Sequence, residues 1–551
     1  MADNTKDYIN KPFNARPVVL WAFFVFLTII MCFWAHDVGW WVIAVWFVMI
    51  LGFFTSLQIL HEKVSFDKTL SFFATSRAFF LGTMMICVVV VVSFALTTHM
   101  YSSQQHFTGQ AELRGIVRSV TFGFEEGSGS IVLSGATFGS QEVRGRVRIN
   151  FRNIDKEYLA YFETGNVVSM PAIIRPTNPS SFSINNNIRY SASVNQVSVN
   201  FVGLSGDLRS VVMRLAQNFL GGHMSEDSSS VIYSMLFGDK SSLEEDVRES
   251  FSLTGLAHVL AVSGLHVGLI VGLLVLVLRF LRIPKRTQFF IILLALLTYA
   301  YLADFRYSII RASIMFSAVL FGRLFVRRRI ELISSICLAG IIIMIIWPYA
   351  ILAWSFQLSF ACLVGIALFS KPTDAWLRKI IPGGKKGSLK GVDGSGGYLT
   401  YSSKDSGFVS NLREATINST MLYVVTTITT FPLLISYFSY FPIIGLVANI
   451  LLLPLLIVAF QLGVIAITTY IGYPLLYLAD WIVFAIVRTS DWLASIPWGS
   501  VTIYSTGAEY MLYFAGLVAL SRFTFIKKRY RYISAGVLFG LYGAVLLVLN
   551  T

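Results

Sequence analysis

The chain has 551 residues, of which 55% are hydrophobic and only 13% are charged, and its mean hydropathy is +0.69. Soluble globular domains carry about 25% charged residues, so the composition excludes an ordinary soluble protein and predicts a polytopic α-helical membrane protein. The formal net charge of +14 fits basic cytoplasmic loops and does not by itself indicate a nucleic-acid partner. The four cysteines all lie in apolar runs and show neither a disulfide framework nor a zinc-ligand spacing.

The N-terminal region, residues 1–104, is expected to cross the membrane three times. Its apolar runs, roughly Pro17–Trp34, Trp40–Leu60 and Ala78–Thr97, are each about long enough to span hydrocarbon. Basic residues gather in the loop after the second run, as expected of a cytoplasmic loop. With a cytoplasmic N-terminus, three spans place the next segment on the outer side of the membrane.

Residues 105–203 have the character of a soluble β domain. Polar and apolar residues alternate in five short segments separated by turns rich in Gly and Asn. The segments are Ala111–Phe122, Ser130–Phe138, Val143–Phe151, Val167–Arg175 and Ser193–Val202. Five short strands in fewer than a hundred residues predict a small, extracytoplasmic β-barrel of the OB-like type, inserted into the membrane protein.

Four arginines stand out in this β domain. Arg144, Arg146 and Arg148 alternate, which places them on one face of a predicted strand, and Arg152 follows them. One interpretation is a DNA-binding strip that follows phosphates beside stackable aromatic rings. The other is a solvated strand face, because arginine is common at exposed strand positions. Both interpretations remain open at this stage.

Residues 204–253 read as a connector made of amphipathic helices. Val211, Leu215 and Phe219 recur at helical spacing with charged residues opposite, which predicts helices lying along the membrane surface. Ser242-Leu-Glu-Glu245 matches a capping box and predicts that a helix opens there.

Residues 254–551 form a second membrane block. Basic clusters follow its first, third, fifth and ninth apolar runs, so every second loop is expected to be cytoplasmic. A stretch rich in Gly, Ser and Lys predicts a cytoplasmic linker near residues 371–413. The predicted spans are Leu256–Leu278, Phe289–Leu302, Tyr307–Gly322, Ile330–Ile346, Ile351–Phe369, Thr416–Phe438, Ile443–Tyr470, Leu475–Val487, Tyr510–Ala519 and Ile533–Leu549.

The stretch Thr254–Val267 is the most informative part of the chain. His258, Val262 and His266 recur every four residues, so on a continuous helix they form one stripe. Ser263 lies near that stripe, and small neighbouring glycines allow another backbone to approach. Polar groups inside hydrocarbon usually face a bundle interior, a cavity or a permeation path.

Further polar residues occur at positions where they are costly. Asp304, Arg306 and Arg311 bracket two spans, and a charge at the bilayer centre costs at least about 2.5–3.5 kcal/mol unless it is paired or hydrated. Simpler explanations exist, because charges often lie at the membrane interface and amides often bridge helices. Together these residues predict a set that lines or gates a channel: His258, Ser263, Gly264, His266, Asp304, Arg306, Arg311, Gln357, Ser359 and Asn449.

Several of these segments carry a family resemblance. In chain order, the motifs resemble those of the ComEC family of competence membrane proteins: Gly238-Asp239, Gly255–Val267, Arg311–Met315, Trp354–Phe360 and Asn449–Pro454. The resemblance implies an inner-membrane channel, with a cytoplasmic N-terminus, that passes single-stranded DNA into the cytoplasm during natural transformation. It also implies partners: a periplasmic or surface DNA receptor, a separate nuclease, and a cytoplasmic ATPase or single-stranded-DNA-binding proteins, besides the lipid bilayer.

One departure from that family matters for the chemistry. Many members carry a C-terminal metallo-β-lactamase-like domain with an HxHxDH cluster, and none of the seven histidines here forms that motif. The chain has no Walker motif either, so we expect no enzyme activity, no cofactor and no metal, with the nuclease and the ATPase supplied by other proteins. The rival interpretations are a secondary transporter for a small anionic solute and a membrane metalloenzyme built on the two histidines.

Overall fold

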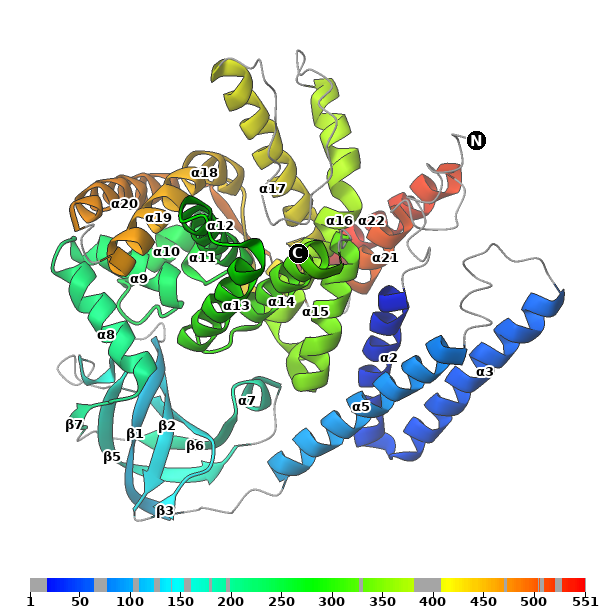
Figure 1. The fold of residues 1–551 in the computed structure, drawn as a ribbon, viewed down its shortest axis with the longest axis horizontal. Helices are drawn as coiled ribbons and strands as arrows, with labels where there is room; N and C mark the ends of the chain where they lie inside the picture. The colour runs from blue at the N-terminus through cyan, green and yellow to red at the C-terminus, as the bar shows by residue number, and fades with distance from the viewer. Residues whose placement is uncertain are drawn as a thin grey trace.

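The computed structural model describes fourteen stretches of the chain, separated by short gaps. They are residues 17–63, 77–102, 109–122, 129–139, 141–152, 160–177, 181–194, 199–326, 331–380, 408–469, 473–503, 505, 510–520 and 528–550. Within these stretches, six helices are long and apolar enough to cross a membrane, or seven if one bent pair counts as a single span. The chain is a multi-pass membrane protein that carries a β-barrel domain beside its helices (Figure 1).

Three long helices form the N-terminal part: α2 (Pro17–Val38), α3 (Trp41–Lys63) and α5 (Arg77–Ser102). They lie close to the predicted spans. The side chains of α2 and α5 pack on those of α14 and α15, so this part joins the second membrane block rather than standing alone. Inside the three-helix group, the Trp46 indole donates to Thr28 Oγ1 at 3.0 Å.

The β domain is a closed barrel of five main strands. The strands run in the order β1-β2-β4-β6-β5, and β5 pairs back with β1. All neighbours are antiparallel except β4 and β6, which are parallel. The strands are β1 (Gly109–Phe122), β2 (Gly129–Phe138), β3 (Gln141–Glu142), β4 (Arg146–Phe151), β5 (Asn166–Pro176), β6 (Ile188–Val194) and β7 (Asn200–Leu204).

The alternating residues explain why the barrel closes. Inward positions such as Leu113, Ile131, Val147 and Met170 are fully buried and fill its core. The prediction of a small five-stranded barrel is confirmed. The predicted single strand Ser193–Val202 is wrong, because that segment divides between β6 and the edge strand β7.

The connector contains α8 (Leu208–Gly221), α9 (Glu226–Phe237) and α10 (Glu245–Leu253). The prediction that all these helices lie along a surface is wrong for α9, whose residues are mostly buried and which packs against α19 and α20. Its N-cap, Ser225, donates from both its backbone N–H and its hydroxyl to the Asp480 carboxylate of α20, at 3.0 and 2.6 Å. The predicted capping box is wrong too, because Glu244 is the N-cap of α10 and its side chain makes no cap bond.

The second membrane block follows the predicted order of spans with some differences. Its helices are α11 (Ala257–Leu260), α12 (Gly264–Phe280), α13 (Lys285–Leu302), α14 (Tyr307–Phe321), α15 (Leu332–Ile346), α16 (Trp354–Ile380), α17 (Phe408–Phe438), α18 (Gly445–Leu451), α19 (Leu453–Thr469), α20 (Tyr473–Ala494), α21 (Tyr510–Leu520) and α22 (Lys528–Asn550). A two-stranded ribbon pairs β8 (Tyr440–Pro442) with β9 (Ser500–Thr502).

Two predicted spans in this block are interrupted, and the predicted linker is shorter. The first span divides into α11 and α12, and the span Ile443–Tyr470 bends by 45° between α18 and α19. Residues 371–380 and 408–413 of the predicted linker are helical, as the ends of α16 and α17. Residues 381–407 lie outside the described part of the chain.

Candidate functional site: a hub around the broken helix

The chain breaks its helix inside Thr254–Val267. α11 ends at Leu260, the backbone is extended at Ala261 (φ −93°, ψ 129°) and Ser263 (φ −122°, ψ 171°), and α12 begins at Gly264. The predicted single stripe of His258, Val262 and His266 is therefore wrong. The physical reason is that Ser263 is a strong N-cap residue, and an N-cap requires extended backbone where a continuous helix would need helical angles.

The new helix start orients His266. Ser263 Oγ accepts from the Leu265 N–H at 3.2 Å, and His266 Nδ1 accepts from the Ser263 N–H at 3.1 Å. Because Nδ1 is an acceptor, a neutral His266 must carry its proton on Nε2. That Nε2 is buried and has no hydrogen-bond partner among the described residues, and the ring packs on Phe460 of α19 at 4.7 Å. His266 thus presents an unused donor inside the protein.

The glycines of this stretch allow close packing, as expected. Gly255 has φ +73°, and a Cβ there would lie 3.0 Å from the ring of Pro442. A Cβ on Gly264 would lie 3.3 Å from Arg311 Nη2, so α14 presses its arginine against the start of α12. The break is therefore in contact with both α14 and the β8–α18 segment.

Arg311 is a buried cation with unused donors. Only 6% of the residue is exposed, and its Nε and Nη1 have no hydrogen-bond partner in the described part of the chain. Its guanidinium lies 5.7 Å from the centre of the Phe360 ring on α16, a contact that offsets part of the cost of burial. An unpaired buried charge is expensive, and a bound anionic group would relieve that cost.

Arg306 and His258 lie beside the same break but are exposed. Arg306 Nη2 donates to the Gly238 carbonyl at 2.7 Å, and a Cβ on Gly238 would come within 3.0 Å of Val262. His258 Nδ1 lies 3.0 Å from the Gly255 carbonyl. We call His258, Ser263, Gly264, His266, Arg306 and Arg311 the signature hub, because the structure brings these six predicted site residues together.

Three other predicted site residues lie elsewhere in the second block. Gln357 donates to the Ile351 carbonyl at 2.9 Å and accepts from the Tyr437 hydroxyl at 2.8 Å, which ties α16 to α17. Asn449 donates to Gly445 O within α18 at 2.7 Å. Ser359 is half-buried on α16. For Gln357 these bonds favour the interpretation as a link between helices, whereas the Asn449 bond stays within its own helix.

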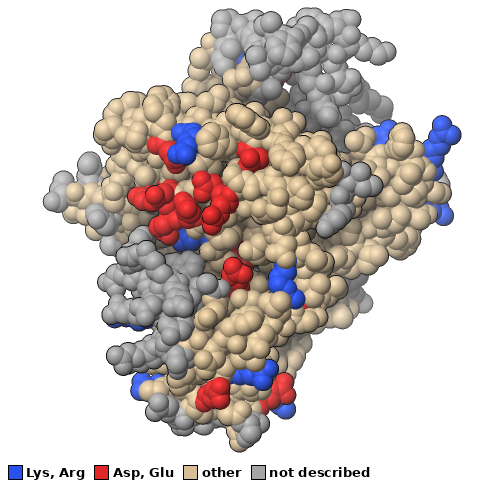
Figure 2. All heavy atoms as spheres, turned by 90° about the vertical axis from the view of Figure 1, so that its left-hand side faces the viewer, with Lys and Arg blue, Asp and Glu red and all other residues tan. Residues whose placement is uncertain are grey.

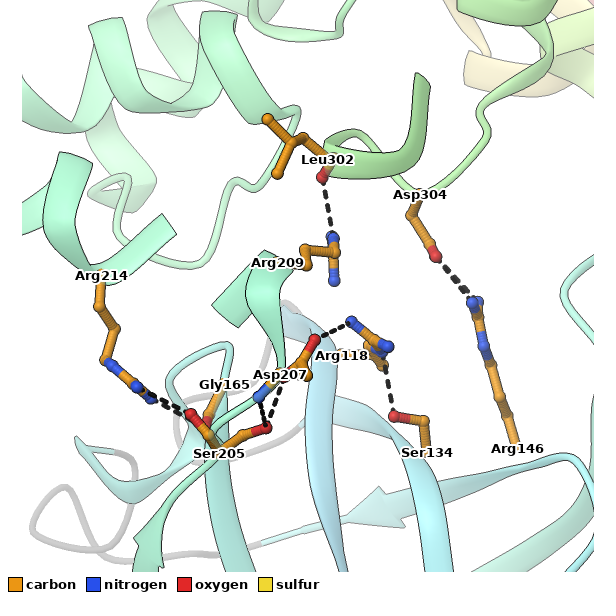
Figure 3. A network of polar contacts seen from close by, with 10 residues as sticks. All are labelled: Arg118, Ser134, Arg146, Gly165, Ser205, Asp207, Arg209, Arg214, Leu302 and Asp304. Carbon is orange, nitrogen blue, oxygen red and sulfur yellow. Dashed lines mark hydrogen bonds and ion pairs between the residues drawn. The ribbon is translucent and has the colours of Figure 1, made fainter. Parts of the chain in front are cut away.

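Asp304 takes part in a different contact, between the barrel and the membrane block (Figure 3). Arg146 of β4 donates two hydrogen bonds, of 2.9 and 2.7 Å, to the Asp304 carboxylate. Burial tends to raise the pKa of Asp304, but Arg146, together with Arg209 and Arg118, outweighs it and the pKa is lowered. Asp304 and Phe305 are both left-handed, with φ of 57° and 50°, so the turn between α13 and α14 is a strained one.

The four arginines of the β domain do not form one strip. Arg144 precedes β4 in an exposed bend, so its predicted place on the strand is wrong; the Gly145 turn intervenes. Arg146 contacts Asp304, Arg148 reaches Ser130 of β2 at 3.3 Å, and Arg152 is exposed just after β4. Part of the predicted DNA-binding set is thus engaged in holding the barrel in place.

The same junction contains arginines that the sequence analysis missed. Arg118 of β1 pairs with Asp207 at 3.3 Å, and Arg209 donates to the Leu302 carbonyl at 2.8 Å (Figure 3). Arg209 is buried, and its Nη1 has no partner among the described residues. Arg118 lies in strand β1 and Arg209 lies at the start of α8. Their spacing in the sequence therefore gives no sign that they lie at the same junction.

Comparison with known proteins decides the family. Residues 235–528 match the family model described as Competence protein. The chain belongs to the Competence protein family. It is 28% identical over 228 residues to ComE operon protein 3 of Bacillus subtilis (strain 168), an alignment that covers 39% of this chain and only 29% of that relative. No solved structure matches.

The Competence protein match separates the site residues into two groups. All ten predicted channel residues, from His258 to Asn449, fall within residues 235–528. The barrel with its four arginines lies before that region. Among the described residues, no three His, Cys, Asp or Glu side chains lie close enough together to hold a metal ion.

Proposed function

We propose that this protein is an inner-membrane channel that carries single-stranded DNA into the cytoplasm during natural transformation. Membership of the Competence protein family supports a role in DNA uptake. The multi-pass helical architecture supports passage through a membrane. The proposal assigns the site of passage to the signature hub.

The observation that carries the proposal is the unused donor capacity of the hub. His266 Nε2 and Arg311 Nε and Nη1 are buried without partners among the described residues, while Arg306 and His258 are exposed next to them. A polyanion crossing a low-dielectric region needs such donors, because bare phosphates are costly there. Arginine is well suited to the task, since it is charged at all relevant pH values and binds phosphate with a fork of N–H groups.

We infer the topology from loop charge and strand order. Three N-terminal spans with a cytoplasmic N-terminus place the barrel outside the inner membrane. We infer that the barrel is OB-like; its five closed strands and its parallel β4–β6 pair support this. Such barrels often bind single strands, and the exposed Arg144 and Arg152 leave part of its surface basic.

We propose a channel without a catalytic step or a cofactor of its own. In that scheme a periplasmic or surface receptor delivers DNA, a separate nuclease removes one strand, and a cytoplasmic ATPase or single-stranded-DNA-binding protein draws the other inward. The family resemblance supports this division of work, and residues 1–551 themselves carry neither a Walker motif nor an HxHxDH motif.

The test is uptake of labelled DNA by cells that express single variants shown to reach the membrane in equal amounts. Arg311→Gln and His266→Ala are expected to leave DNA outside the cytoplasm, whereas two matched controls transport normally. The controls are Arg488→Gln, which removes an exposed arginine of α20, and Ser335→Ala, which removes a buried hydroxyl that already bonds to Leu332 O. Normal uptake by both hub variants, or saturable uptake of a small anion in place of DNA, contradicts the proposal.

A further inference from the structure

A cavity of about 380 Å³ lies where the barrel meets the connector helices. On the barrel side it is lined by Phe162, Glu163 and Thr164, just before β5. On the helical side it is lined by α8, by α9 and by the loop that follows α9. We call it the junction pocket, and its lining residues are distinct from those of the signature hub.

One face of α9 supplies the floor of the junction pocket. Glu226, Ser229, Ser230 and Tyr233 all line it, and they occupy positions i, i+3, i+4 and i+7 of the helix. In a helix buried between other elements, that stripe is ordinarily apolar. The other side of α9 is apolar, with Ile232 and Leu236 in the core that α19 and α20 share. The polar stripe is therefore a specific feature of the pocket side.

Two hydroxyl groups among the lining residues have no hydrogen-bond partner in the described part of the chain. Tyr233 is 3% exposed, and the structure gives its hydroxyl no hydrogen bond to any described residue. Ser242 Oγ is buried and likewise unpartnered within the described stretches. Buried polar side chains are usually satisfied, so the unpartnered Tyr233 hydroxyl in the lining of this cavity indicates a missing ligand or ordered solvent.

The charge of the pocket lining is negative. Glu163 and Asp239 lie close to each other, and Glu226 is at the opposite end of α9 from Asp239. The lining residues include no Lys or Arg, although Arg209 and Arg306 interact with Asp239 from outside the lining. Glu226 and Tyr233 are separated by about 10 Å along the helix axis. Burial, followed by the charge of Asp239, raises the pKa of Glu163. Acidic side chains also gather on this face of the molecule (Figure 2), which makes it unfavourable for DNA.

We propose that the junction pocket binds an extended organic cation, with an ammonium group between Glu163 and Asp239 and the rest of the ligand along α9 toward Glu226. An ammonium group donates three hydrogen bonds, which matches carboxylates surrounded by hydroxyls. A bare metal ion fits less well, because both Asp239 oxygens already accept hydrogen bonds, from the Thr164 hydroxyl and from the Ser241 N–H. The ammonium group could belong to a free polyamine or to a lysine side chain of a partner protein.

The experiment titrates the full-length protein in detergent at constant ionic strength and measures heat of binding. The probes are spermidine, a short peptide with one lysine and blocked ends, and magnesium chloride. The pocket variants are Glu163→Gln and Tyr233→Phe, and the second keeps the test valid if the first does not fold. The matched control is Glu249→Gln, which removes an exposed carboxylate of α10 outside the pocket lining.

We expect an ammonium probe to bind wild-type protein and Glu249→Gln equally, and the pocket variants at least about tenfold more weakly, the loss expected for one charge-assisted hydrogen bond. Tighter binding of spermidine assigns the site to a free polyamine, and tighter binding of the peptide assigns it to a partner's lysine. The proposal is overturned if neither ammonium probe saturates, if all variants bind alike, or if magnesium alone responds to Glu163→Gln. It does not depend on DNA transport.

Discussion

Two arginines of the membrane block, Arg311, which is buried, and Arg378, which is partly buried, show opposite arrangements. Arg378 of α16 donates from Nε to both oxygens of Asp374 at 3.0 Å, and from its two other nitrogens to Glu414 of α17 at 2.8 Å each. Arg311 of α14 has an aromatic ring beside it and unused N–H groups. A saturated arginine ties two helices together, whereas an unsaturated one retains its capacity to bind a ligand. The hydrogen-bond partners of each guanidinium among the described residues distinguish the two roles.

The largest expected effect is on the free energy of unfolding, when Arg378, whose nitrogens are all hydrogen-bonded, is replaced. Arg378→Met leaves the buried carboxylates of Asp374 and Glu414 facing each other without a cation. Removing one partner of a buried pair costs about 3–5 kcal/mol, and the 16% exposure of the Arg378 side chain favours the lower figure. Denaturant unfolding in detergent measures it, with Arg488→Met as control. Equal stability of the two variants refutes the structural role.

The second prediction concerns the backbone of the signature hub. Gly255→Ala places a side chain at φ +73° and against Pro442, which we expect to cost about 2 kcal/mol. Gly272→Ala in α12 is the matched control, because a Cβ there meets nothing within 4 Å and alanine favours helix. The same unfolding assay applies. A stable Gly255→Ala protein means that the break of the helix can relax.

The third prediction tests whether Arg311 differs from Arg378 in its role. Arg311→Met removes a buried charge that has no ion-pair partner among the described residues, so stability is expected to stay equal or to rise by about 1 kcal/mol. DNA uptake by the same variant is expected to fall by about tenfold to a hundredfold, the value of one or two charge-assisted hydrogen bonds. A loss of stability similar to that of Arg378→Met indicates that Arg311 is structural after all.

The smallest effect concerns the junction between the barrel and the membrane block. Because the pKa of Asp304 is lowered in the folded protein, its contribution to stability is present above its unfolded pKa of about 3.9 and is lost as the pH falls through the folded value. The pair is partly exposed, so we expect about 1 kcal/mol. Wild type and Asp304→Asn should differ in unfolding at pH 7 and converge in acid. A constant difference down to pH 2 excludes this linkage.

Periodicity predicted most of the architecture. The barrel strands and the order of the spans follow from alternation and from apolar runs of sufficient length, and both are local signals. The break at Ser263 was not predicted, because the four-residue spacing of His258 and His266 fits a continuous helix equally well. The N-cap preference of serine was the available signal.

The site was predicted less completely than the fold. The sequence singled out six residues that do meet at the signature hub, since charged and polar groups in apolar runs are conspicuous. It could not show that Asp304 belongs to the barrel contact, because its partner Arg146 is 158 positions away. It also missed the polar stripe of α9, because serines near a helix start look like ordinary solvent-facing residues.

The short turn between α13 and α14 has a consequence for engineering. Asp304 accepts hydrogen bonds from Arg146 of the barrel, and Arg306, two positions later, donates to the Gly238 carbonyl at the end of α9. A chimera that exchanges the barrel for that of another protein must therefore carry over this turn with its length unchanged. If the length of this turn changes, a barrel that docks on residue 304 displaces Arg306 from its position beside the helix break.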